Sequence, residues 1–163
     1  MSKKKEKKYL NIINNEKFFT NKSINYCDNI DLKTIPEGLV KFFNVTLIAR
    51  KSKIYRSQKV QLKNFKLAEN IFIYINLIYK SLKERKSNYL VISITPYTFL
   101  ACLVLFLFRQ KVLIYLRSDG HKEYKIISGS FGSFLYSVMF TIISWKASFV
   151  TCGPHLLKKK KKK

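Results

Sequence analysis

The sequence predicts an α/β fold with a doubly wound, mostly parallel sheet and helices on both faces. Short runs rich in β-branched and aliphatic residues, such as 89–94 and 111–116, alternate along the chain with longer apolar segments of helical period. Such alternation favours parallel strands joined by right-handed crossovers, which place helices on both faces of the sheet. The 163 residues, 47% of them hydrophobic, suffice for the core of one domain.

The expected strands are separated by polar segments. The run 89–94 is continuously apolar, which is typical of a strand covered on both faces. The polar stretch 14–31 is expected to form a loop. In chain order, the strands are expected at residues 9–13, 44–49, 59–62, 89–94, 111–116 and 147–152.

The expected helices are indicated by capping residues and by apolar spacing. Thr34 and Pro36 are typical of a helix start, and Thr95 followed by Pro96 is another such start. One apolar stripe of helical period, beginning at Ile71, indicates a helix over 67–86. Two more helices are expected over 97–108 and about 131–145. Together these elements predict a Rossmann-like sheet, whose ligands bind beyond the carboxyl ends of the strands.

The formal charge of +23 depends strongly on the ends of the chain. Residues 1–8, with five lysines, are expected to form a basic disordered tail, and 158–163 are six lysines. The remaining body carries +13, which fits attachment to an anionic membrane surface. Nucleic acid is not an expected partner, because no nucleic-acid-binding module is recognisable.

Two uncharged segments, 88–108 and 126–145, are each long enough to span a membrane. Thr95 and Pro96 interrupt the first, and serines and glycines dilute the second. We therefore expect a buried strand plus helix in the first segment, a helix in the second, and peripheral rather than spanning attachment. A small integral membrane protein remains the alternative. Three separated cysteines fit a reduced cytoplasmic location, and their spacing predicts no metal site.

The candidate site residues lie where expected strands end. Arginine binds phosphate or carboxylate, histidine transfers protons near neutral pH, and glycine permits a turn that redirects its neighbours. An ordinary polar loop would have the same composition. Asp28 and Asp31 are expected to serve a solvated loop or a helix cap, and 129–132 to form a loop or helix start packed close to the sheet. The turn after 111–116 holds Arg117, Ser118, Asp119, Gly120 and His121, and the other candidates are Thr95, Tyr97 and Asn15.

Four stretches resemble the amino-terminal domain of GT-B glycosyltransferases, particularly the retaining family that builds lipopolysaccharide and capsule. The resemblance implies that residues 9–157 form one of the two GT-B domains, on the acceptor side of the cleft. It also implies a catalytic role for His121. The other candidates are expected to bind substrate because they lie where strands end. Asn14 and Asn15 stand where the family commonly has paired glycines. The four stretches are residues 28–39, 43–50, 89–96 and 117–124.

The substrates implied by this resemblance are a nucleotide-sugar donor and a glycan or lipid-linked acceptor in cell-surface polysaccharide synthesis. No cofactor or metal is implied, and the missing second domain would bind most of the donor. The lysine run 158–163 is expected to record a truncation or frameshift, so that this fragment alone would be inactive. A non-catalytic Rossmann-like binding module is the other alternative.

Overall fold

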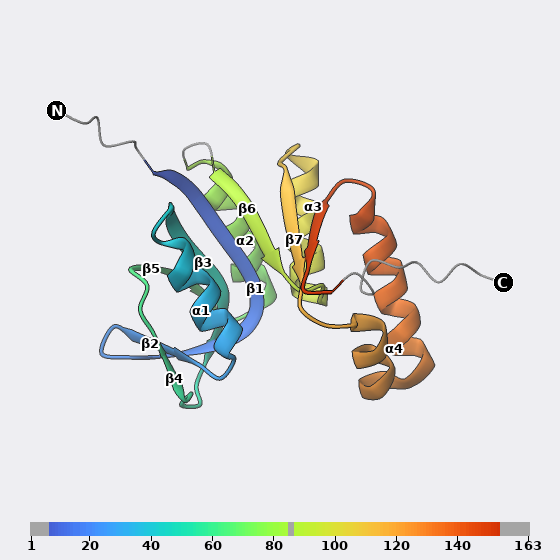
Figure 1. Ribbon diagram of the computed structural model, residues 1–163, viewed down its shortest axis with the longest axis horizontal. Helices are drawn as coiled ribbons and strands as arrows, with labels where there is room; N and C mark the ends of the chain where they lie inside the picture. The colour runs from blue at the N-terminus through green and yellow to red at the C-terminus, as the bar shows by residue number, and fades with distance from the viewer. Residues whose placement is uncertain (1–6, 85–86, 154–163) are drawn as a thin grey trace.

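The computed structural model describes residues 7–84 and 87–153, which form an α/β structure around a mostly parallel mixed sheet (Figure 1). Six parallel strands lie side by side in the order β5, β3, β1, β6, β7, β8. Their bounds are Asn64–Ala68 (β5), Phe43–Ser52 (β3), Lys8–Asn21 (β1), Ser87–Ile92 (β6), Val112–Leu116 (β7) and Ser148–Thr151 (β8).

Two short antiparallel strands extend the sheet at the far end of β1. The strand β2 (Ile24–Cys27) pairs with β1, and β4 (Gln58–Val60) pairs with β2. The turn between β1 and β2 holds Lys22 and Ser23, both with positive φ, the conformation required by a two-residue hairpin of type I′.

Helices cover both faces of the sheet. Residues on one face pack with α1, and residues on the other face pack with α2, α3 and α4, so two separate apolar clusters form. Ile12 and Ile13, neighbours in β1, are both fully buried but belong to opposite clusters, because successive strand residues point to opposite faces. The helices are α1 (Ile30–Leu39), α2 (Ile71–Leu82), α3 (Pro96–Leu107) and α4 (Gly120–Ser144).

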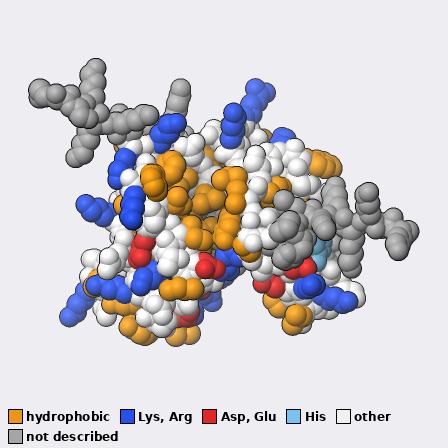
Figure 2. Space-filling model, in the orientation of Figure 1, with side chains coloured by type: hydrophobic (Ala, Val, Ile, Leu, Met, Phe, Trp, Pro, Cys, Tyr) orange, Lys and Arg blue, Asp and Glu red, His pale blue; other side chains and the backbone are white. Residues whose placement is uncertain are grey.

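The sheet is unevenly covered on the α1 side. Leu113 of β7 and Val150 of β8 are exposed on this side. Ile114, the next residue of β7, points to the opposite face and is buried there. Figure 2 shows hydrophobic side chains gathered in the hollowed middle of this face. The core is therefore complete around β1 and β3 and one-sided around β7 and β8.

Several expected elements are confirmed. The expected strand 89–94 is shifted by two residues from β6, which spans Ser87–Ile92, whereas 111–116 contains β7 and 97–108 matches α3 within one residue. Thr95 caps α3 in a capping box with Thr98, and Pro96 occupies the first turn as expected. The uncharged segment 88–108 is thus a strand followed by a helix, and it is not one long helix.

The prediction of a loop at 14–31 is wrong for most of that segment. β1 continues to Asn21 after a register shift between Ile13 and Lys17, and it pairs with β3 and then β2. Phe18 is fully buried in this extension. Polar residues lie around Phe18 along this extension. The average polarity of the segment therefore resembles that of a loop.

The start expected for the first helix is also wrong. Asn29 is the cap, its side-chain oxygen accepting from the Asp31 amide at 3.0 Å, and α1 begins at Ile30. Pro36 consequently lies inside the helix, although the sequence suggested the first turn. Burial of Leu32 and Pro36 against the sheet supplies the packing that extends the helix backwards.

The segment 67–86, expected to be one helix, contains the end of a strand and then a helix. Residues up to Ala68 belong to β5, which pairs with β3, and α2 begins at Ile71 after the cap Asn70. The pairing that makes β5 a strand is long-range, and local apolar spacing does not reveal it.

The helix expected over about 131–145 is confirmed as the second of two helical segments in α4, and the first segment, which begins at Gly120, was not expected. The backbone of α4 turns a corner at Ser128 (φ −139°, ψ 22°) and Gly129 (φ 63°, ψ −151°). A side chain on Gly132 would overlap the Tyr124 carbonyl, so the two segments pack directly on each other. The glycines at 129 and 132 thus lie at the start of the second helical segment, as expected, but the close packing there is with Tyr124 of the first segment and not with the sheet.

The expected tails fall largely outside the described residues. Of residues 1–8, only Lys7 and Lys8 are described; Lys8 begins β1, and the Lys7 ammonium donates to the Val40 carbonyl at 2.7 Å. The lysine run 158–163 and the chain from 154 onward lie outside the described residues, as does the end of the domain expected at 9–157.

Candidate functional site at the carboxyl edge of the sheet

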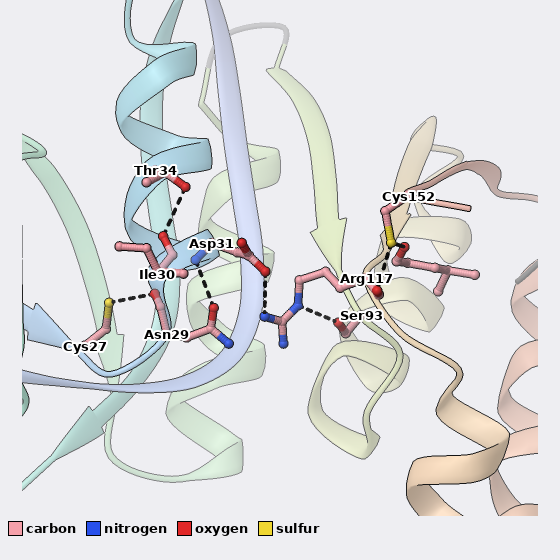
Figure 3. Close-up of polar contacts among 9 residues, drawn as sticks. Cys27, Asn29, Ile30, Asp31, Thr34, Ser93, Arg117 and Cys152 are labelled. Carbon is pink, nitrogen blue, oxygen red and sulfur yellow. Dashed lines mark hydrogen bonds and ion pairs between the residues drawn. The ribbon is translucent and has the colours of Figure 1, made fainter. Parts of the chain in front are cut away.

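Arg117 joins three elements at the carboxyl edge of the sheet. It follows β7 directly, and one of its terminal nitrogens donates to Asp31 Oδ2 at 3.3 Å, in the first turn of α1. Its Nε donates to Ser93 Oγ, just beyond β6, at 3.4 Å (Figure 3). A half-buried guanidinium therefore spans the ends of β6 and β7 and the start of α1.

Ser93 has a left-handed backbone, with φ of 64°, which non-glycine residues seldom adopt. Its amide donates to the Tyr115 carbonyl at 2.9 Å, and its own carbonyl accepts from the Thr98 hydroxyl at 2.9 Å. Such a conformation costs about 1–3 kcal/mol and persists where surrounding contacts impose it. The turn after β6 is therefore held in a strained shape that presents the Ser93 hydroxyl to Arg117.

A second arginine, Arg50 near the end of β3, lies beside two predicted site residues. It donates to Asn15 Oδ1 at 3.3 Å, and its guanidinium carbon lies 4.4 Å from the centre of the Tyr97 ring. The Tyr97 ring in turn meets the buried Tyr74 ring edge-on at 5.3 Å. Asn15 and Tyr97, from β1 and α3, are thus brought together through a residue that the sequence interpretation did not select.

Asn14 is buried where β1 shifts register, and its amide nitrogen Nδ2 has no hydrogen-bond partner among the described residues. Its other polar groups are satisfied: Oδ1 accepts from the Glu16 amide at 2.9 Å, and the carbonyl accepts from the Tyr74 hydroxyl at 2.7 Å. Burial raises the pKa of Tyr74, so this hydroxyl remains a donor. An unsatisfied buried donor costs about 1–3 kcal/mol, and a ligand acceptor would remove that cost.

The other predicted site residues mainly organise the start of helices. Thr95 uses its hydroxyl to accept from the Thr98 amide at 3.3 Å, capping α3. Asp119 caps α4 by accepting from the Lys122 amide at 3.3 Å, and Ser118 is half-buried in the preceding turn. Gly120 lies against the Tyr136 ring, which any side chain at position 120 would overlap.

His121 lies in the first turn of α4, where a turn outside any helix was expected. Its Nδ1 is 3.2 Å from the Ser137 hydroxyl, and its ring meets the Tyr136 ring edge-on at 4.8 Å. Both contacts are within α4. Among the described residues, no hydrogen bond joins His121 to Arg117, whose partners are Asp31 and Ser93.

Asp31, Ser93, Arg50 and Asn14 were missed by the sequence interpretation or given a lesser role. Asp31 was expected in a solvated loop or cap, yet it lies in α1 and pairs with Arg117 while staying about half exposed. Arg50 could have been found, because it directly follows the apolar run 44–49. Asn14 had no such signal, since its burial depends on the continuation of β1.

The described residues contain no group of three or more His, Cys, Asp or Glu side chains arranged to hold a metal ion.

Comparisons with protein-family models, with curated proteins and with solved structures find no match. The function of this chain therefore has to be argued from the chemistry of the carboxyl edge.

Proposed function

We propose that this chain binds a phosphate-bearing sugar substrate at the carboxyl edge of its sheet, as the acceptor-side domain of a GT-B-type glycosyltransferase. The strand order supports the proposal. Numbered along the chain, the parallel strands lie in the order 3-2-1-4-5-6, which is that of the doubly wound Rossmann fold. In that fold ligands bind where the order reverses, here between β1 and β6.

The observation that carries the proposal is the unpartnered Nδ2 of Asn14 at this reversal point. Arg50 on β3 and Arg117 directly after β7 flank this point and supply two guanidinium groups at the same edge, because parallel strands end there together. Arginine matches the geometry of phosphate oxygens and can bind them in pairs. Asp31 and Ser93 add a carboxylate and a hydroxyl, which are suited to sugar hydroxyl groups.

The roles of the residues follow from their existing contacts. Asn15 and Tyr97 position Arg50, while Ser93 and Asp31 position Arg117, so each guanidinium keeps donors for a ligand. The catalytic role that the resemblance implies for His121 would require its ring to leave Ser137 and Tyr136. Ligand binding as proposed does not depend on that movement.

The test is titration of the 163-residue chain with glucose 1-phosphate and with galactose 1-phosphate, two phosphate-bearing sugars, followed by calorimetry or by amide chemical shifts. We expect binding that weakens roughly tenfold or more in Arg50→Gln and in Arg117→Gln, because each removes a charged hydrogen bond to phosphate. Arg109→Gln, at the opposite edge of the sheet after α3, is the matched control. Absence of binding to either compound, or equal weakening in the control, would overturn the proposal.

A non-catalytic binding module is the second candidate, and the contacts of His121 favour it. A proton-transferring histidine should reach the ligand, whereas His121 contacts Ser137 instead. The two candidates differ when the chain is joined to the donor-binding domain of a GT-B glycosyltransferase. Transferase activity that is lost in His121→Ala would support the enzyme, and ligand binding without turnover would support the module.

A further inference from the structure

We infer that the outer surface of α3 and α4 docks onto an anionic phospholipid bilayer. This surface, termed the outer face, includes the exposed side chains Leu107, Phe131, Phe134, Val138 and Trp145. It lies on the side of α4 that does not pack against the sheet. The inference is independent of the ligand proposed at the carboxyl edge.

The second segment of α4 is apolar on two sides. Gly132, Tyr136, Met139 and Ile143 follow the helical period and are buried on the core side. Phe131, Leu135, Val138 and Ile142 follow the same period one position earlier, on the outer side. Phe131 remains 72% exposed and Trp145 76% exposed. A third side carries Ser133, Ser137 and Thr141, so the segment is apolar on two sides, and the core covers only one of them.

A groove of about 310 Å³ runs between α3 and α4 on this surface. Apolar side chains form most of its wall, and one lysine also lines it. It is lined by Leu103, Phe106, Leu107, Ile142, Trp145 and Lys146. An apolar groove beside a cationic group is suited to a lipid chain with its phosphate headgroup.

The charges around the outer face favour an anionic membrane over a protein partner. Residues 124–153 contain no aspartate or glutamate. Lys125 lies in the segment before the corner, and Lys146 directly follows Trp145. Lys122, in that first segment, is paired with Asp119 and adds no net charge. Arg109 and Lys111 follow the end of α3. Basic residues around an exposed aromatic surface are typical of peripheral membrane binding.

Length and composition alone would also permit α4 to span a bilayer; it is the one helix among the described residues that meets those criteria. The corner at Ser128 and Gly129 interrupts it, and its core side packs against α3 and the sheet. Spanning would expose the buried Tyr136 and Met139 and open the core. Docking of the outer face leaves the fold intact.

Trp145 is the single tryptophan of the chain, so intrinsic fluorescence reports directly on the outer face. With vesicles of equal parts phosphatidylcholine and phosphatidylglycerol, we expect its emission to shift to shorter wavelength. Binding should weaken as salt rises, because exposed charges are screened. Vesicles of phosphatidylcholine alone should bind much less.

Two variants localise the contact. Phe131→Ser should lower vesicle binding roughly tenfold, because it removes a large apolar side chain from the lipid. Phe42→Ser is the matched control, since Phe42 is 70% exposed outside the outer face and its loss should leave binding unchanged. Lys125→Glu, an exposed charge reversal that leaves the packing intact, should weaken binding several-fold and reduce its salt dependence.

Circular dichroism of each variant checks that it is folded. The inference is overturned by equal binding to both kinds of vesicle, or by equal effects of Phe131→Ser and Phe42→Ser. Retention in membranes after alkaline carbonate would show that α4 spans the bilayer. A concentration-dependent dimer that shifts Trp145 emission without lipid would show that the outer face joins two copies. Loss of glucose 1-phosphate binding in Arg50→Gln with unchanged vesicle binding would separate this inference from the proposed function.

Discussion

Gly120 and Gly38 are two helical glycines in opposite surroundings. A side chain on Gly120 would overlap the ring of the buried Tyr136, whereas nothing lies within 4 Å of the corresponding position on Gly38. We expect Gly120→Ala to lower the free energy of unfolding by about 1–3 kcal/mol, because the Tyr136 ring must move within a packed core. Gly38→Ala should raise it by up to about 1 kcal/mol, because alanine favours helix.

Urea denaturation of both variants measures this difference. Similar free energies of unfolding for Gly120→Ala and Gly38→Ala would mean that the contact of Gly120 with Tyr136 is not tight in solution. His121 contacts the same Tyr136 ring, at 4.8 Å between ring centres.

Individual site residues were predictable to different degrees. Thr95 and Arg117 were identified because a cap and a strand end have local sequence signals. Asn14 was not selected, because its burial depends on pairing of β1 with β3 and β6 on both sides. His121 was placed in a turn, and its contacts with Ser137 and Tyr136 depend on the corner of α4.

At the scale of elements, the corner of α4 depends on Gly129. Its φ of 63° with ψ of −151° is a conformation adopted almost only by glycine. Gly129→Ala should therefore cost about 1–3 kcal/mol in unfolding free energy and loosen the segment before the corner. Chemical denaturation measures the cost, and the nuclear magnetic resonance signals of His121 report the loosening.

Ser130→Ala is the control for this prediction, since Ser130 is exposed at the same corner. We expect a change within about 0.5 kcal/mol there, as for most surface substitutions. An equal cost for both substitutions would show that the corner tolerates any residue at position 129.

Element prediction succeeded where local signals and tertiary contacts agree. The segments that became β6, α3 and β7 carry both apolar runs and capping residues. It failed for β5 and for the second half of β1, where pairing with distant strands overrides a helical or polar pattern. It also placed the start of α1 too late, because Asn29 is as good a cap as Thr34.

For the whole molecule, buried groups with raised pKa values predict a loss of stability in alkali. Burial raises the pKa of the Cys102 thiol from 9.0 to about 12, and that of Cys27 to about 11. The unfolded chain therefore releases these protons at lower pH than the folded chain. These two thiols leave the free energy of unfolding unchanged below about pH 9, and they lower it as the pH rises further. The contribution of Cys102 falls by about 1.4 kcal/mol per pH unit up to about pH 12.

Denaturation at about pH 8 and about pH 10 checks this window. Cys102→Ala should reduce the difference in unfolding free energy between the two pH values by about 1 kcal/mol. Cys152→Ala, at an exposed cysteine, is the matched control. A pH dependence that is the same in both variants would contradict a buried, neutral Cys102 thiol.

The sequence by itself determined the fold class and the order of most elements, because apolar period and capping residues act over a few neighbours. It also predicted that charged side chains follow β7, and a helix start follows β6, at one edge of the sheet. Only the tertiary structure decided that Arg117 meets Asp31 and Ser93, and that Arg50 meets Asn15 and Tyr97. Those contacts join residues between 24 and 86 positions apart in the chain. They are fixed by the order and the register of the strands, and no short stretch of sequence encodes that order or that register.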